Sequence, residues 1–241
     1  MPRSGVVLAA GLGSRLREHD DAVLKPMMAV GGVPMVFRAL RQLELAGCDE
    51  LVVVIGHRGD ELRAAIASAA PTRAPIVFVE NPEYRLSNGV SLLCARPRLA
   101  PTFVVAMADH LIGPSVMALA HTHTPAPGGA TLLVDRRVAD VFDLDDATKV
   151  KCEGARLRDI GKQLVDYDCI DVGVFVCTHG LLDALQGVRE RRGDASLSEG
   201  VAALAAADRM AVLDIEGGFW QDVDTPEMLA HAERCLAAGM A

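Results

Sequence analysis

The chain alternates between short apolar runs and longer segments in which apolar positions recur every three or four residues. The apolar runs predict buried strands, at residues 5–10, 51–55, 76–79, 102–107, 130–134, 171–177 and 210–214. The periodic segments predict amphipathic helices, at residues 34–46, 60–70, 114–120, 179–187, 197–207 and 226–236. Strands and helices therefore alternate along most of the chain.

This alternation predicts an α/β fold with a mostly parallel central sheet and helices on both faces. The regular order breaks at residues 149–153 and 156–160, which predict a β-hairpin around Gly154. We interpret residues 135–170 as an insertion over the site, within one domain that spans residues 1–241. Ligands of such sheets bind beyond the carboxyl ends of the strands. The loop that follows residue 10 is therefore the first candidate site.

Composition narrows the classes of partner. The net charge of −8 disfavours nucleic acid, and no apolar run approaches the roughly 18–20 residues that a membrane span needs. The six cysteines are scattered without a C-x-x-C pair, which is typical of reduced thiols in a cytoplasmic protein. The N-terminus leads directly into a strand, so we expect no signal peptide. The sequence leaves a homodimer open.

The first loop carries the strongest chemical signal. Gly11-Leu12-Gly13-Ser14-Arg15-Leu16 follows the first apolar run, and Lys25 follows nine residues later. Two glycines let backbone N–H groups approach a bulky anion. A dinucleotide-binding fingerprint needs glycine at Leu16, and no Walker A lysine-serine pair is present. A glycine-rich turn with a solvated arginine is the alternative interpretation.

Residues 8–16, 25–28 and 32–35 together resemble the signature of nucleotidyltransferases that activate phosphorylated sugars and polyols, and the resemblance returns at residues 220–226. It implies a Rossmann-like, GT-A-like nucleotidyltransferase fold. It also implies a nucleoside triphosphate as donor, a small phosphorylated acceptor and Mg²⁺ as cofactor.

The resemblance assigns catalytic roles to four residues. Asp109, just past a buried strand, and Asp222 would hold the Mg²⁺, while Lys25 would neutralise charge near the α-phosphate. Arg15 and the neighbouring amides would hold the leaving pyrophosphate. A helix cap is the alternative role for Asp109. For Asp224 we expect a cap of the final helix, a role for which Thr225 competes.

The segment around Asn88 suggests which nucleotide is used. The cytidylyltransferases for inositol 1-phosphate, phosphocholine and aminoethylphosphonate carry a similar Asn-rich, Ser-Leu segment here, which favours CTP. A capped helix start is the alternative. The predicted nucleotide-binding residues are Leu8, Ala10, Gly11, Gly13, Ser14, Arg15, Lys25, Asn88, Gly89 and Ser91.

The same resemblance predicts the residues that bind the acceptor. In the cytidylyltransferases named above, a Lys-Val strand and an Ile-Gly-Lys hairpin close over the acceptor. The predicted acceptor-binding residues are Asp135, Lys149, Lys162, Asp171 and Gly173; surface lysines are the alternative for the two lysines. An aromatic content of 4% weakens a choline-type acceptor, so inositol 1-phosphate is the best match. The open alternatives are a sugar-1-phosphate nucleotidyltransferase using UTP, dTTP or GTP, a phosphocholine or aminoethylphosphonate cytidylyltransferase, and a non-catalytic nucleotide sensor.

Overall fold

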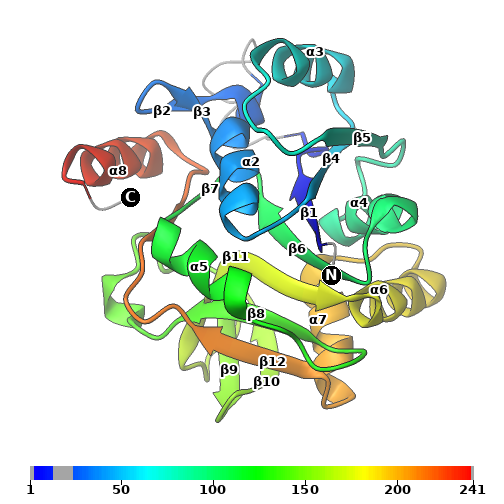
Figure 1. Ribbon diagram of the computed structural model, residues 1–241. Coiled ribbons are helices and arrows are strands. Elements are labelled where there is room, and N and C mark those ends of the chain that lie inside the picture. Colours follow the sequence, from blue (N-terminus) through cyan, green and yellow to red (C-terminus); the bar gives the residue numbers. More distant parts are fainter. Residues whose placement is uncertain (1–2, 13–23, 240–241) are drawn as a thin grey trace.

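A computed structural model describes residues 3–12 and 24–239. Within these residues the centre is a nine-stranded sheet with the order β5-β4-β1-β6-β11-β8-β12-β10-β9 (Figure 1). Its strands are β1 (Arg3–Leu8), β4 (Glu50–Ile55), β5 (Ile76–Glu80), β6 (Thr102–Met107), β8 (Ala130–Asp135), β9 (Lys149–Glu153), β10 (Arg156–Gly161), β11 (Cys169–Thr178) and β12 (Met210–Asp214).

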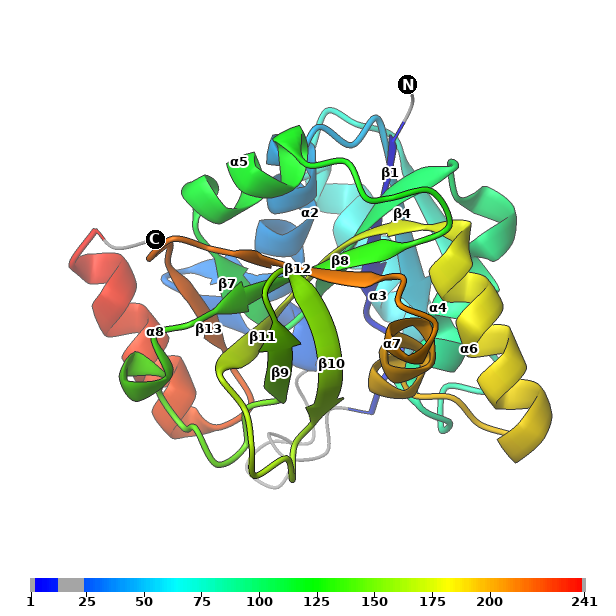
Figure 2. The same ribbon diagram turned by 90° about the horizontal axis from the view of Figure 1, so that it is seen from below.

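Helices cover both faces of this sheet. The described helices are α2 (Met35–Leu45), α3 (Gly59–Ala69), α4 (Asn88–Ala95), α5 (Pro114–Thr122), α6 (His179–Arg192), α7 (Leu197–Ala206) and α8 (Pro226–Ala237). Helices α2, α3 and α5 pack on one face, and α4, α6 and α7 pack on the other (Figures 1 and 2). The expected α/β fold is confirmed.

The continuous apolar runs are explained by these two helix layers. Successive residues of a strand point to opposite faces, so Val6 and Leu8 enter the core beneath α4, α6 and α7, whereas Val7 enters the core beneath α2, α3 and α5. Each fully buried valine or leucine contributes roughly 1.5–3 kcal/mol of transfer free energy. A strand covered on both faces therefore shows no polar alternation.

The sheet is mixed: its larger parallel part comes from the N-terminal half of the chain, and β8 and β12 form a second parallel pair. β5, β4, β1 and β6 run parallel to one another, and β11 lies antiparallel between β6 and β8. The predicted hairpin is present, because β9 pairs with β10, and it extends the sheet through β11 and β12. The parallel strands bring their carboxyl ends to one edge, where Leu8 lies opposite Met107.

Two short ladders complete the described fold. One joins β7 (His110–Ile112) to β13 (Trp220–Asp222), and the other joins β2 (Ala29–Val30) to β3 (Val33–Pro34). Strands of two or three residues are too short to produce a periodic pattern, so the sequence did not predict them. The β7–β13 ladder joins two segments that are far apart in the sequence.

None of the helices in residues 3–12 and 24–239 has the length and apolar character needed to cross a lipid bilayer.

Candidate active site

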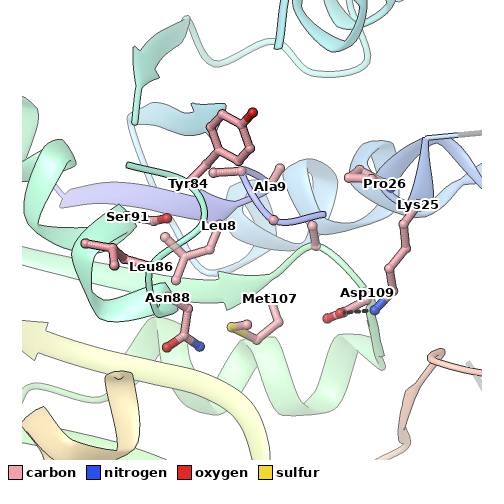
Figure 3. Close-up of a pocket in the computed structure, with 13 residues that line it drawn as sticks. Leu8, Ala9, Lys25, Pro26, Tyr84, Leu86, Asn88, Ser91, Met107 and Asp109 are labelled. Carbon is pink, nitrogen blue, oxygen red and sulfur yellow. Dashed lines mark hydrogen bonds and ion pairs between the residues drawn. The ribbon is translucent and has the colours of Figure 1, made fainter. Parts of the chain in front are cut away.

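A pocket lies beyond the carboxyl ends of β1 and β6 (Figure 3). One end of it is mostly apolar and carries two polar side chains, and the other end carries Lys25 and Asp109. The residues that line it are Leu8, Ala9, Ala10, Gly11, Lys25, Pro26, Tyr84, Leu86, Asn88, Ser91, Met107, Ala108 and Asp109. We call this the nucleotide pocket.

Most predicted nucleotide-binding residues that can be located line this pocket: Leu8, Ala10, Gly11, Lys25, Asn88 and Ser91. The predicted residues Gly13, Ser14 and Arg15 lie outside the described part of the chain. Gly89 does not line the pocket. A Cβ at Gly89 would lie 2.5 Å from the carbonyl oxygen of Ala195, so this glycine instead lets α4 pack closely against the segment before α7. The nucleotide contact predicted for Gly89 does not fit its position.

Lys25 begins the short helix η1 (Lys25–Met27) and points into a pair of carboxylates. Its Nζ donates to Asp109 Oδ2 at 2.5 Å and also to Asp224 Oδ1. Burial opposes the charge of Lys25, but the charges of Asp109 and Asp224 outweigh it and raise the pKa of Lys25. The lysine is therefore a fixed cation in this structure.

Asp109 is held from two sides. Its Oδ1 contacts His110 Nδ1 at 2.8 Å, while Oδ2 accepts from Lys25. Burial alone would raise the pKa of Asp109, but Lys25 and the hydrogen bond with His110 lower it well below its usual range. Asp109 is therefore ionised, as a ligand for a divalent cation must be.

The β7–β13 ladder brings Asp109 and Asp222 to the same place. Asp222 lies directly opposite His110, and the N–H of Val223 donates to the carbonyl oxygen of Asp109 at 2.9 Å. Burial raises the pKa of Asp222; His110 opposes this increase, and the charges of Asp224 and Asp109 add to it. The two predicted metal ligands are thus neighbours, although they lie 113 positions apart in the sequence (222 − 109).

Asp224 belongs to the same group of carboxylates, which corrects the role we expected for it. The final helix α8 is capped by Thr225, whose side chain accepts from the N–H of Met228. Carboxylate oxygens of Asp146, Asp222 and Asp224 lie within 4.8 Å of one another. Residues two apart in an extended segment share a face, which is why Asp222 and Asp224 both reach the pocket. Hard oxygen ligands of this kind fit a divalent cation such as Mg²⁺.

A second pocket adjoins the first and shares Asn88, Met107 and Asp109 with it. Its lining is largely polar and includes five aspartates, and we call it the acceptor pocket. The lining residues are Asn88, Met107, Asp109, His110, Asp146, Ala147, Thr148, Lys162, Asp171, Gly173, Phe175, Leu197, Ser198, Trp220, Asp222 and Asp224.

Three of the predicted acceptor residues line this pocket. Lys162 donates to Asp146 Oδ1 at 2.7 Å, and Asp171 Oδ1 accepts from the N–H of Gly173 at 2.7 Å. Gly173 has a φ of +77° and lies against the ring of His110, so both its backbone conformation and its lack of a side chain are required there. Acceptor binding by these three residues remains a prediction.

Two other predicted acceptor residues lie elsewhere. Lys149 is buried, and its Nζ donates to the carbonyl oxygen of Asp145 at 2.8 Å, so it supports the loop that carries Asp146. Asp135 accepts from Arg137 and from Trp220 Nε1 at 2.9 Å. Asp135 therefore positions the indole of Trp220 through this hydrogen bond. Neither Asp135 nor Lys149 lines the acceptor pocket, so the acceptor contacts predicted for them do not fit these positions.

Asp171 provides a prediction about pH. Burial raises the pKa of Asp171 to about 6, although the N–H of Gly173 and the charge of His110 oppose this. Between about pH 4 and 6 the folded chain therefore binds a proton that the unfolded chain releases. The wild type therefore loses stability as the pH rises through 6, because the buried Asp171 carboxyl must then ionise. Asparagine at this position does not ionise, so we expect the Asp171→Asn variant to become more stable than the wild type over that rise. The difference is at most about 3 kcal/mol.

Urea unfolding of both proteins from pH 4.5 to 8 measures this difference. An Asp60→Asn variant, at an exposed position in α3, is the matched control. If the two unfolding free energies differed by the same amount at every pH, the protonation of Asp171 inferred here would be contradicted.

Several pocket residues were not predicted as site residues. Asp146 and Tyr84 both lie in turns between regular elements, where no strand or helix pattern points to a ligand. Trp220 is the single tryptophan of the chain, and its position next to Asp222 was the available signal. Its ring stacks near that of His110, with centroids 6.4 Å apart.

Comparison with known proteins adds a family and a fold. The sequence of residues 5–206 matches the family described as the MobA-like NTP transferase domain. A protein of Rubrobacter xylanophilus described as a bifunctional IPC transferase and DIPP synthase is 40% identical over 97% of this chain. A protein of Aquifex aeolicus with the same description is 31% identical over 98% of this chain. In each case the match covers 52% of the relative, so the chain spans about half the length of these relatives.

A solved structure is similar along its whole length. The inositol-1-phosphate CTP transferase from T. maritima superimposes with a TM-score of 0.83 and 26% identity, covering 100% of this chain and 98% of that one.

Proposed function

This chain belongs to the MobA-like NTP transferase domain family, and we propose that it transfers a cytidylyl group from CTP to inositol 1-phosphate. The observation that carries the proposal is the junction of the two pockets, which share Asn88, Met107 and Asp109. A nucleotide in the first pocket and a phosphorylated acceptor in the second would meet beside Lys25.

The reaction needs positioning and charge neutralisation more than proton transfer. An oxygen of the acceptor phosphate attacks the α-phosphorus of CTP, and the bond from the α-phosphorus to the bridging oxygen breaks as pyrophosphate leaves. The acceptor phosphate is already ionised near neutral pH, so no general base is required. Lys25 would neutralise charge on the α-phosphate, and the backbone at Gly11 would approach the phosphates closely.

Asp109 and Asp222 would hold Mg²⁺. Asp146 and Asp224 lie close to Asp222, and Asp224 shares Lys25 with Asp109. When bound, Mg²⁺ neutralises charge on the phosphate oxygens and stabilises the transition state. A divalent cation held by these carboxylates would explain how a chain with a net charge of −8 binds two polyanions. In the absence of a cation these carboxylates would repel the substrates.

The acceptor pocket suits a small polyol that carries a phosphate. Lys162 supplies a cation for the phosphate, and Thr148, Ser198 and Asp171 supply hydroxyl and carboxylate groups for the ring hydroxyls. We infer that the β9–β10 hairpin, in the region of residues 135–170, covers this acceptor. The choice of inositol 1-phosphate is supported by the transferase from T. maritima, whose fold and chain length this chain matches.

Pyrophosphate release by the purified chain tests the proposal. CTP, UTP, GTP, ATP and dTTP are each combined with inositol 1-phosphate, glucose 1-phosphate, phosphocholine or 2-aminoethylphosphonate, with and without Mg²⁺. We expect release with CTP and inositol 1-phosphate, dependent on Mg²⁺, and a CDP-inositol product by mass spectrometry. Release with another pair would transfer the proposal to that donor and acceptor, and no release with any pair would favour a nucleotide-binding role without turnover.

A further inference from the structure

Asn81, which lines neither pocket, follows β5 and is 1% exposed. Its Oδ1 accepts from the N–H of Glu83 at 2.9 Å, and its Nδ2 donates to Ser91 Oγ at 2.9 Å. A backbone N–H can only donate, so the contact with Glu83 fixes which side of the amide is the oxygen. The nitrogen of Asn81 must therefore face Ser91.

This contact limits what the Ser91 hydroxyl can do. A hydroxyl has one proton to donate and two lone pairs, and one lone pair of Ser91 is taken by Asn81. Over residues 3–12 and 24–239, no protein group accepts the Ser91 proton, and the hydroxyl points toward Leu8 in the nucleotide pocket (Figure 3). Ser91 is 5% exposed, so little water reaches its hydroxyl, and we infer that an atom of a bound ligand accepts its proton.

Asn88 is oriented in the same way by a different element. Its Oδ1 accepts from the N–H of Leu197 at 2.8 Å, at the first residue of α7. Its Nδ2 therefore faces away from α7, on the Met107 side of the pocket (Figure 3). The apolar end of the nucleotide pocket thus presents two oriented donors, one from Ser91 and one from Asn88.

We propose, on the basis of the proposed function, that these two donors read the adjacent N3 and O2 acceptors of cytosine, and that Asn81 is a positioning residue for this choice of base. The base lies at the apolar end of the pocket among Leu8, Tyr84 and Met107, and Lys25 and Asp109 mark the phosphate end.

The arrangement distinguishes cytosine from uracil and thymine. In those two bases position 3 carries a proton, so a donor would face a donor, and the buried Ser91 proton would lose its acceptor. Leaving one buried donor unpaired lowers affinity about tenfold to hundredfold. Shape alone cannot supply this discrimination, because uracil and cytosine have nearly the same size.

An Asn81→Asp variant reverses the direction of the hydrogen bond between residue 81 and Ser91, and residue 81 itself does not line the nucleotide pocket. One carboxylate oxygen still accepts from Glu83, but the other accepts the Ser91 proton, which then no longer points at the base. We expect the ratio of kcat/KM for CTP to that for UTP to fall at least tenfold at pH 8, with the KM for the acceptor unchanged. A Ser91→Ala variant, which removes the hydroxyl, should lower the same ratio at least tenfold.

Ser4→Ala is the matched control. Ser4 is a buried serine at the opposite end of β1, and its Oγ accepts one hydrogen bond, from the N–H of Ala100 at 2.9 Å. The Ser4→Ala variant also loses a buried hydroxyl, but far from the pocket. Its ratio of kcat/KM for CTP to that for UTP should therefore stay within twofold of the wild type. Melting temperatures of all three variants show whether each is folded.

Calorimetric dissociation constants for CTP and UTP separate this inference from the proposed function, because they need no turnover. A wild type that binds CTP more tightly, together with a loss of that preference in Ser91→Ala, supports the inference even if no transfer occurs. The inference is overturned if the wild type binds UTP as tightly as CTP, or if the folded variants keep the wild-type ratio within twofold. Transfer from UTP at the wild-type rate for CTP would overturn it while leaving nucleotidyl transfer intact.

Discussion

A Lys25→Ala variant is expected to catalyse nucleotidyl transfer about a hundredfold to a thousandfold more slowly than the wild type at saturating substrates, the usual cost of losing a charge-stabilising donor in an active site. Lys25 is the cation of the nucleotide pocket within residues 3–12 and 24–239. Its ammonium lies beside Asp109, at the junction with the acceptor pocket. Charge that develops around the α-phosphorus would therefore have no fixed partner in the variant.

The measurement is kcat from pyrophosphate release, with CTP, acceptor and Mg²⁺ all saturating. Arg96→Ala is the control, because Arg96 follows α4 and pairs with Asp183 on the surface of α6, and it lines neither pocket. We expect that control to stay within twofold of the wild type. A folded Lys25→Ala protein with more than a tenth of the wild-type kcat would show that Lys25 is not part of the catalytic machinery.

Asp109→Asn and Asp222→Asn variants are each expected to lose turnover by about a thousandfold and to bind Mn²⁺ at least tenfold more weakly. Both carboxylates line the acceptor pocket, and the β7–β13 ladder fixes their separation. Replacing one oxygen ligand with an amide removes a negative charge and weakens a hard-cation site. Asparagine is nearly the same size as aspartate, so a loss of activity reports on the charge.

Electron paramagnetic resonance of Mn²⁺, recorded with CTP present, measures this binding directly, and kcat is measured over a range of Mg²⁺ concentrations. Asp183→Asn is the control, since Asp183 pairs with Arg96 on the surface of α6. Unchanged Mn²⁺ affinity in both variants would rule out the two carboxylates as ligands. Lost affinity in one variant only would identify a site built from that residue and its other neighbours, Asp146 or Asp224.

Local pattern was enough to predict most of the fold. The strands of the parallel sheet are buried on both faces, so they read as unbroken apolar runs, and residues 51–55 and 102–107 lie within β4 and β6 as expected. The helix expected at residues 197–207 is α7, and it begins at a capping box formed by Ser196 and Glu199. These signals come from neighbouring residues and need no tertiary contact.

Long-range side-chain contacts were beyond the reach of that pattern. Nothing local distinguishes Asp222 from Asp224, and only the fold shows that both carboxylates reach the pocket. Asp135 follows a buried strand as Asp109 does, yet it faces Arg137 and Trp220. Gly89 has the appearance of a ligand-binding glycine, although its role is to pack against Ala195.

The sequence by itself therefore determined the layers of this protein and the edge of the sheet where its chemistry must lie, because strand burial and the carboxyl ends of parallel strands follow from local patterns. The tertiary structure alone decided which charges meet and which way each polar group points. Lys25 is paired with residues 84 and 199 positions away, and Asn81 orients Ser91 through a single hydrogen bond. Such contacts depend on distances between separate elements, which no stretch of sequence specifies.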